Sequence, residues 1–209
     1  PFEIAEDIGI GLAKAALAAK VNGELVDLSY PITEDAEIRI ITFKDDAGKD
    51  IFRHSSSHLM SQAVNRLYKS VKQGVGPSVE DGFYQDFDLN TTISLDDLPK
   101  IEAEMKKIVE EDLSFERLEI KKSEAKKLFK DDPYKAEMID KLVGDAVTVY
   151  RSGEYHDLCK GPHVPSTGKI KAFKLTKVAG AYWKGDSENK MLQRIYGISF
   201  PEEKELKKY

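Results

Sequence analysis

The chain has 209 residues, a formal charge of −5 and 41% hydrophobic residues, enough apolar material for a folded core. No apolar run approaches the length that spans a bilayer, and no basic region followed by an apolar one marks a secretory signal. The single cysteine excludes an intrachain disulfide. We therefore expect a cytoplasmic protein without a membrane partner, with a mitochondrial location left open.

Residues 1–43 are predicted to form a small unit of one helix, one hairpin and one strand. Residues 8–19 carry alanine and leucine at helical spacing. Asn22 and Gly23 form the dipeptide that is typical of a tight hairpin turn. Residues 38–43 alternate isoleucine with polar residues, as half-buried strands do. This order suits the later part of a ubiquitin-like β-grasp unit that lacks its first hairpin.

A larger α+β unit is expected over residues 51–199, after a polar linker at 44–50 and before a connecting helix that starts within 200–209. Apolar stripes predict long amphipathic helices over 55–71 and 95–112. Shorter patterns predict helices at 123–129 and 135–142 and strands at 115–120, 147–150 and within 171–199.

Two pairs of residues carry the metal-binding or catalytic potential of this sequence. His54 and His58 are four residues apart, so on a helix both imidazoles project from one face. Cys159 and His163 are also four apart, but Pro162 between them indicates a loop. Together the pairs could close a tetrahedral zinc site, or hold a zinc-activated water with three ligands.

Other interpretations stay open on the residues alone. Each pair by itself is often only a feature of the surface, and a metal-free cluster could use a histidine or lysine to position water as a general base. Asp157 could orient a histidine or a substrate amine, or could simply cap its loop. Lys135 is an ordinary surface lysine until the fold brings it near the histidines. These patterns indicate a small hydrolase or a zinc module.

The stretch from Lys160 to Arg194 has eight basic residues against two acidic ones. In a net acidic protein, such a stretch can bind a phosphate backbone locally. The alternative is a solvated lysine-rich surface.

Four segments form a more specific pattern than either pair. They are RHSSSHLM at 53–60, GP with GFY within 76–84, DLCKGPHVP at 157–165 and AGAYWKGDSENKMLQRIYG at 179–197. Together they resemble the amino-terminal region of threonyl-tRNA synthetases, over nearly the whole chain. Residues 1–43 resemble the TGS domain of that family without its first hairpin. Residues from 51 onward resemble its editing domain, which is related to that of alanyl-tRNA synthetases.

The resemblance implies an aminoacyl-tRNA deacylase that hydrolyses mischarged seryl-tRNA(Thr). Serine lacks one methyl group of threonine, and a group of that size is worth only about 1–3 kcal/mol of discrimination, so a second sieve is needed. The partners implied are the acceptor end of tRNA(Thr) and the remainder of the synthetase. No ATP site is expected in these residues. The alternative is a non-catalytic tRNA-binding or regulatory module.

The resemblance also implies roles for single residues. His54 and Lys135 would position or activate the attacking water, and Asp157 would bind the α-amine of the substrate. The pocket would be shaped by His58, Cys159 and His163, and substrate would contact Gly76, Pro77 and Tyr84. Gln85 stands where many relatives carry a second tyrosine. We expect editing without a cofactor; if zinc is bound, its ligands would be His54, His58, Cys159 and His163.

Overall fold

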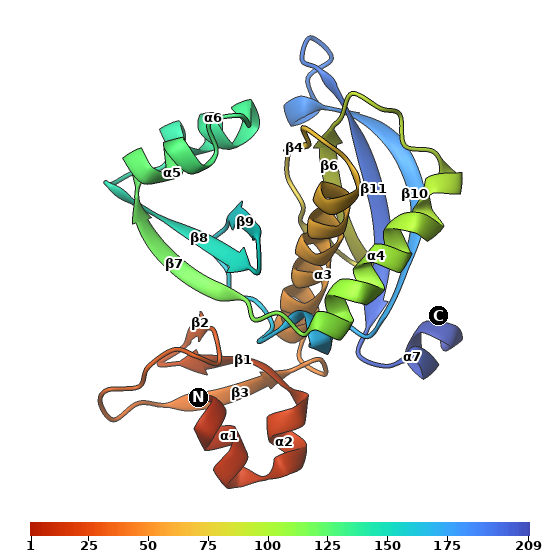
Figure 1. The fold of residues 1–209 in the computed structure, drawn as a ribbon. Helices are drawn as coiled ribbons and strands as arrows, with labels where there is room; N and C mark the ends of the chain where they lie inside the picture. Colours follow the sequence, from red (N-terminus) through yellow and green to blue (C-terminus); the bar gives the residue numbers. More distant parts are fainter.

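A computed structural model describes all 209 residues as an α+β fold with three antiparallel sheets (Figure 1). The first 42 residues form a small unit, coloured red to orange. Its elements are α1 (Phe2–Ile8), α2 (Ile10–Ala15), β1 (Ala16–Val21), β2 (Glu24–Val26) and β3 (Ile38–Thr42). The sheet order is β2-β1-β3.

The predicted helix over 8–19 is wrong at its carboxyl-terminal end, because residues from Ala16 onward form strand β1. Ala16, Ala18 and Ala19 are fully buried and pair with β3. Burial and strand pairing thus override the helix propensity of alanine. The predicted hairpin is confirmed: Asn22 and Gly23 both have positive φ, at 49° and 85°, and join β1 to β2.

Helix α3 (Asp46–Leu67) is the central element of the larger unit. It begins inside the segment expected to be a linker, so most of residues 44–50 are its first turns. Figure 1 shows α3 and α4 (Leu98–Glu111) against one face of the largest sheet, of order β10-β11-β6-β4. The strands of that sheet are β4 (Lys72–Gln73), β5 (Ser78–Val79, paired with β6), β6 (Gly82–Asp88), β10 (Ala172–Tyr182) and β11 (Met191–Phe200).

A third sheet lies on the other side of α3 and has the order β7-β8-β9 (Figure 1). Two short helices follow β7 and precede β8. The bounds are β7 (Glu116–Lys121), α5 (Lys122–Leu128), α6 (Pro133–Lys141), β8 (Ala146–Ser152) and β9 (Tyr155–Leu158). Short 3₁₀ turns lie at Leu95–Asp97, Thr167–Lys169 and Trp183–Gly185, and α7 (Glu203–Lys208) closes the chain.

The main hydrophobic core joins the two units. Its 23 buried residues include Leu17 and Ile41 of the small unit beside Ile51 and Phe52 of α3. Shared burial of this kind resists relative motion of the two units. None of the helices combines the length and the apolar composition needed to cross a membrane.

Candidate active site

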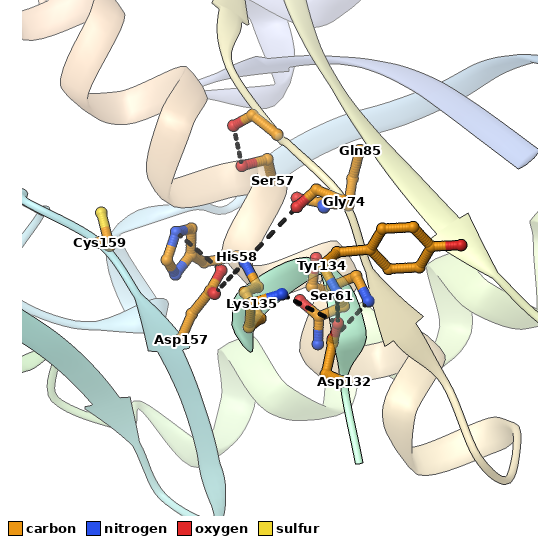
Figure 2. A network of polar contacts seen from close by, with 12 residues as sticks. Ser57, His58, Ser61, Gly74, Gln85, Asp132, Tyr134, Lys135, Asp157 and Cys159 are labelled. Carbon is orange, nitrogen blue, oxygen red and sulfur yellow. Dashed lines mark hydrogen bonds and ion pairs between the residues drawn. The ribbon is translucent and has the colours of Figure 1, made fainter. Parts of the chain in front are cut away.

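The side chains singled out in the sequence converge between α3 and the third sheet, and Figure 2 shows four of them, which are His58, Lys135, Asp157 and Cys159. Helix α3 carries His54 and His58, and helix α6 carries Lys135. Asp157 lies on β9, and the loop after β9 supplies Cys159 and His163, which complete the set. Helix α6 is anchored at its start by Asp132, whose carboxylate accepts hydrogen bonds from the backbone N–H groups of Tyr134 and Lys135.

His54, His58, Cys159 and His163 form what we call the histidine–cysteine cluster. Their potential ligand atoms all lie within 4.8 Å of one another. The rings of His54 and His58 lie 4.8 Å apart, so the prediction that both project from one helical face is confirmed. The His163 ring packs between Phe115 at 4.9 Å and His58 at 4.2 Å.

Hydrogen bonds fix the tautomers of His54 and His163. The Nδ1–H of His54 donates to the carbonyl of Gly76 at 3.0 Å, which leaves Nε2 with a lone pair. The hydroxyl of Ser55 donates to the carbonyl of Ile51 and therefore accepts from Nδ1 of His163 at 2.9 Å. Both Nε2 atoms then face Cys159 Sγ, at 3.1 Å from His54 and 3.3 Å from His163.

Two imidazole lone pairs therefore meet one sulfur that has a single proton to donate. The thiol can donate to His54 or to His163 at any moment, and not to both. The unpaired nitrogen is free to accept a proton or to bind a cation. The donor set of three imidazoles and one sulfur fits a zinc ion, which such ligands hold in structural and catalytic sites.

Ser55 is a residue of the site that the sequence patterns did not single out. It lies inside α3, fully buried, and accepts a second hydrogen bond from the backbone N–H of Val164 at 3.1 Å. The signal that could have found it is the run Ser55-Ser56-Ser57 within an otherwise apolar helical stretch. Buried hydroxyls need partners, and Ser55 finds one in His163.

Lys135 and Asp157 form a buried ion pair beside the cluster. Lys135 Nζ lies 2.5 Å from Asp157 Oδ1, and their side chains are 6% and 5% exposed. The other carboxylate oxygen lies 3.5 Å from His58 Nε2 and 3.2 Å from the hydroxyl of Tyr155. The fold thus turns a lysine that looks ordinary in sequence into a buried cation at the site.

Burial sets the protonation of the cluster. It lowers the pKa of His54, although the hydrogen bond to Gly76 opposes the shift, and it holds the pKa values of His58 and His163 well below the usual 6.5. Burial, with the charge of Asp157, raises the pKa of the Cys159 thiol to about 12. At neutral pH the cluster therefore carries neutral imidazoles and a protonated thiol.

A pocket of about 210 Å³ opens on this arrangement. His54, His58, Lys135 and Asp157 line it, whereas Cys159 and His163 are not among its lining residues and lie behind the two α3 histidines. The rest of the wall is Gly74, Val75, Gly76, Pro77, Gln85, Met138 and Leu158. Two larger hollows, of about 820 and 1010 Å³, also contain charged residues, and they include Lys135 and His163 respectively, but neither contains His54, His58 or Asp157. We therefore assign the candidate active site to the smaller pocket, where these three side chains meet Lys135.

Tyr84 does not line this pocket, although the sequence analysis expects it to contact substrate. Successive residues of β6 point to opposite faces of the sheet, so Gln85 faces the pocket and Tyr84 faces away from it. Tyr84 instead lies 5.6 Å from the ring of Tyr196 and under the guanidinium of Arg194. Gln85, noted only as a departure from relatives, takes the place at the pocket wall.

Gly76 brings the chain close to the pocket. A Cβ at this position would overlap the side-chain amide of Gln85 and approach Ser57 Oγ within 3.1 Å. The carbonyl of Gly76 also accepts hydrogen bonds from His54 and from the Ser57 hydroxyl. The absence of a side chain therefore allows this segment to pack directly against Gln85 and Ser57 at the pocket wall.

Half of the basic stretch between Lys160 and Arg194 is neutralised within the chain. Four of its cations form ion pairs, which are Lys174 with Glu102, Lys184 with Glu137, Lys190 with Asp88 and Arg194 with Asp86. A stretch that is strongly basic in sequence is therefore a weaker phosphate-binding surface in the fold.

Two segments of the chain match known protein families, and the matches define its class. Residues 1–42 match the family described as "TGS domain". Residues 147–196, which include Asp157, Cys159 and His163, match "Threonyl and Alanyl tRNA synthetase second additional domain". The chain is thus a TGS domain followed by an editing-type second additional domain of an aminoacyl-tRNA synthetase.

Comparison with similar proteins shows which synthetase the chain resembles. The chain is 54% identical to the threonine–tRNA ligase of Carboxydothermus hydrogenoformans over 211 residues, which cover 100% of this chain and 33% of that protein. It is 51% identical to that of Acetivibrio thermocellus (99% and 33% covered) and 55% identical to that of Staphylococcus carnosus (98% and 32%). The chain belongs to the threonyl-tRNA synthetase family, and it spans about a third of the length of these relatives.

Proposed function

We propose that this chain is the editing part of a threonyl-tRNA synthetase and hydrolyses the ester of seryl-tRNA(Thr). The observation that carries the proposal is the meeting of a neutral histidine, a buried lysine and a buried carboxylate in one small pocket. The acceptor end of tRNA(Thr) and the remainder of the synthetase are the partners that this function requires.

Asp157 is the group for the substrate's α-ammonium. Its carboxylate is buried beside Lys135 and His58, and a second cation would share its two oxygens. Binding the amine there orients the aminoacyl ester, with its carbonyl turned toward His54. Gly76 and Pro77 form the wall that the terminal adenosine would approach.

His54 is the group for the attacking water. When the Cys159 thiol donates to His163, Nε2 of His54 keeps a lone pair although the sulfur lies 3.1 Å away, and the proposal requires the attacking water to reach this nitrogen from the pocket and give it a proton. The resulting hydroxide attacks the ester carbonyl, the bond to the ribose oxygen breaks, and the proton held by His54 passes to that oxygen. Serine and the free 3′ end of the tRNA leave, and Lys135 helps to hold the water and the developing charge.

If a zinc ion were bound, the four members of the histidine–cysteine cluster would hold it, and it would supply Lewis acidity that lowers the pKa of a nearby water. The steps above use only side chains of this chain. His58, Cys159 and His163 then act by fixing His54 and the pocket around it, because their rings and sulfur pack directly behind it.

A comparison of two substrates tests the proposal. The chain is incubated with seryl-tRNA(Thr) and threonyl-tRNA(Thr), and loss of each ester is followed. We expect faster loss of the seryl ester and a sharp decrease in that rate in His54→Gln. The matched control is His156→Gln, which alters the one histidine outside the cluster. Equal rates for both esters would contradict the proposal.

A non-catalytic tRNA-binding module is the alternative. It would bind tRNA strongly, lose affinity as salt rises, and leave both esters intact. The internal ion pairs of the basic stretch favour the deacylase over this alternative.

A further inference from the structure

A carboxylate of the TGS unit reaches the loop that completes the active site. Asp27 follows β2, and its Oδ1 accepts a hydrogen bond from the backbone N–H of His163 at 3.0 Å. Its Oδ2 accepts a second one from the hydroxyl of Tyr150 at 2.7 Å. Both partners lie deep in the other unit, at 1% and 2% exposure. The two units are therefore joined at the site itself.

Tyr150 transmits this contact to the whole loop. Its hydroxyl packs against Gly161, which has φ +70° and where any Cβ would overlap the tyrosine ring. The N–H of Gly161 donates to Cys159 Sγ at 3.2 Å. The ring of Tyr150 also lies 4.5 Å from that of His163. Asp27 thus holds the loop directly at His163 and indirectly, through Tyr150 and Gly161, at Cys159.

Asp27 differs from the other polar contacts between the units. Lys169 donates to the carbonyl of Lys14 in an exposed contact, and Arg39 pairs with Asp45 at the start of α3, but neither contact involves a member of the cluster. Asp27 forms no ion pair, so its two hydrogen bonds are its only polar side-chain contacts in the chain. No cation offsets the cost of desolvating this carboxylate, so we attribute to it a role in holding the loop rather than a large contribution to the stability of the whole chain.

We propose that Asp27 is a positioning residue of the editing site, through which the TGS unit holds the Cys159–His163 loop behind His54. The inference rests on the proposed deacylase function. If the loop shifts, His163 Nε2 and Cys159 Sγ no longer face His54, and the nitrogen that accepts the water proton loses its fixed place.

The experiment compares Asp27→Ala with Asp35→Ala, which removes an exposed aspartate of the same unit that forms no side-chain hydrogen bond or ion pair. Two readouts are taken at a temperature where all variants are folded. One is kcat and KM for seryl-tRNA(Thr). The other is the rate of alkylation of Cys159 by iodoacetamide, which is specific because the chain has one cysteine.

For Asp27→Ala we expect kcat to fall about tenfold or more, with KM much less affected, because displacement of catalytic groups by about 1 Å has effects of this size. Cys159 alkylation should become several-fold faster as its loop opens. Asp35→Ala should match the original chain in both readouts. If Asp27→Ala does not fold, Asp27→Asn replaces it: the amide oxygen keeps the His163 bond, and we expect an intermediate alkylation rate.

The outcomes separate the two proposals. Alkylation of Cys159 in Asp27→Ala, or in Asp27→Asn, at the rate of Asp35→Ala overturns the positioning role. If the original chain hydrolyses neither ester, the deacylase proposal fails, and the alkylation rates still decide whether Asp27 holds the loop. A merely structural role would lower the melting temperature and leave both readouts of the folded protein unchanged.

Discussion

Lys135 and Asp157 form an ion pair that is almost closed to water, and its removal is the sharpest test of the site's architecture. Lys135→Met removes the charge and keeps the length of the side chain. Asp157 is then a carboxylate at 3% exposure without a cation. Breaking one side of a buried pair costs about 3–5 kcal/mol, because the remaining charge stays desolvated.

The matched control is an ion pair whose cation is exposed. Lys174 and Glu102 lie 3.0 Å apart, and their side chains are 57% and 13% exposed; Glu102 also accepts a hydrogen bond from the backbone N–H of Leu175, so it keeps a partner when the lysine is removed. Lys174→Met should cost no more than about 1 kcal/mol, since solvent screens such pairs. Urea unfolding followed by circular dichroism measures both. The double variant Lys135→Met with Asp157→Asn should recover much of the loss, because no lone charge remains.

Equal destabilisation by Lys135→Met and Lys174→Met would refute this reasoning. It would mean that water reaches Asp157 freely, and the carboxylate could not then serve as a desolvated partner for the substrate amine. A domain of this kind has about 5–15 kcal/mol of stability in total, so the expected loss is measurable without unfolding the chain.

Three further predictions concern the cluster. Ser55→Ala leaves His163 Nδ1–H and Val164 N–H without an acceptor and should lower the free energy of unfolding in urea by about 2–4 kcal/mol. The control Ser61→Ala removes a buried hydroxyl without a hydrogen-bond partner and should lower it far less. Equal losses of stability in the two variants would contradict the assigned hydrogen bonds. Burial lowers the pKa of His54, so the folded site takes up a proton only below pH 6.5. The deacylation rate, measured against pH, should therefore begin to fall only below pH 6.5 as His54 is protonated. A fall that begins above pH 6.5 would contradict a neutral His54. Metal analysis should find no stoichiometric zinc, and chelator should leave hydrolysis unchanged; stoichiometric zinc whose removal abolishes hydrolysis refutes the metal-free mechanism.

Sequence patterns located the two residue pairs of the histidine–cysteine cluster because the information in such spacings is local. Spacing of four places His54 and His58 on one face of any helix, and the structure has them there. The proline between Cys159 and His163 correctly indicated a loop. The strands and helices of the larger unit likewise follow apolar periodicity, although α3 begins earlier than its apolar stripe does.

The parts that sequence could not supply depend on distant contacts. Lys135 becomes a buried cation only because α6 packs beside β9 and Asp157. Alternation along β6 implies that Tyr84 and Gln85 face opposite sides, but it does not say which side holds the pocket. The contact of Asp27 with His163 spans 136 residues and leaves no local pattern.

The central claim is that this chain hydrolyses seryl-tRNA(Thr) in preference to threonyl-tRNA(Thr) with its own side chains. The most direct measurement is the single-turnover rate of ester loss for both substrates, in the original chain, His54→Gln and His156→Gln. We expect faster loss of the seryl ester, a large decrease in its rate in His54→Gln and no change in His156→Gln. Equal loss of the two esters, or an unchanged rate in His54→Gln, would contradict it.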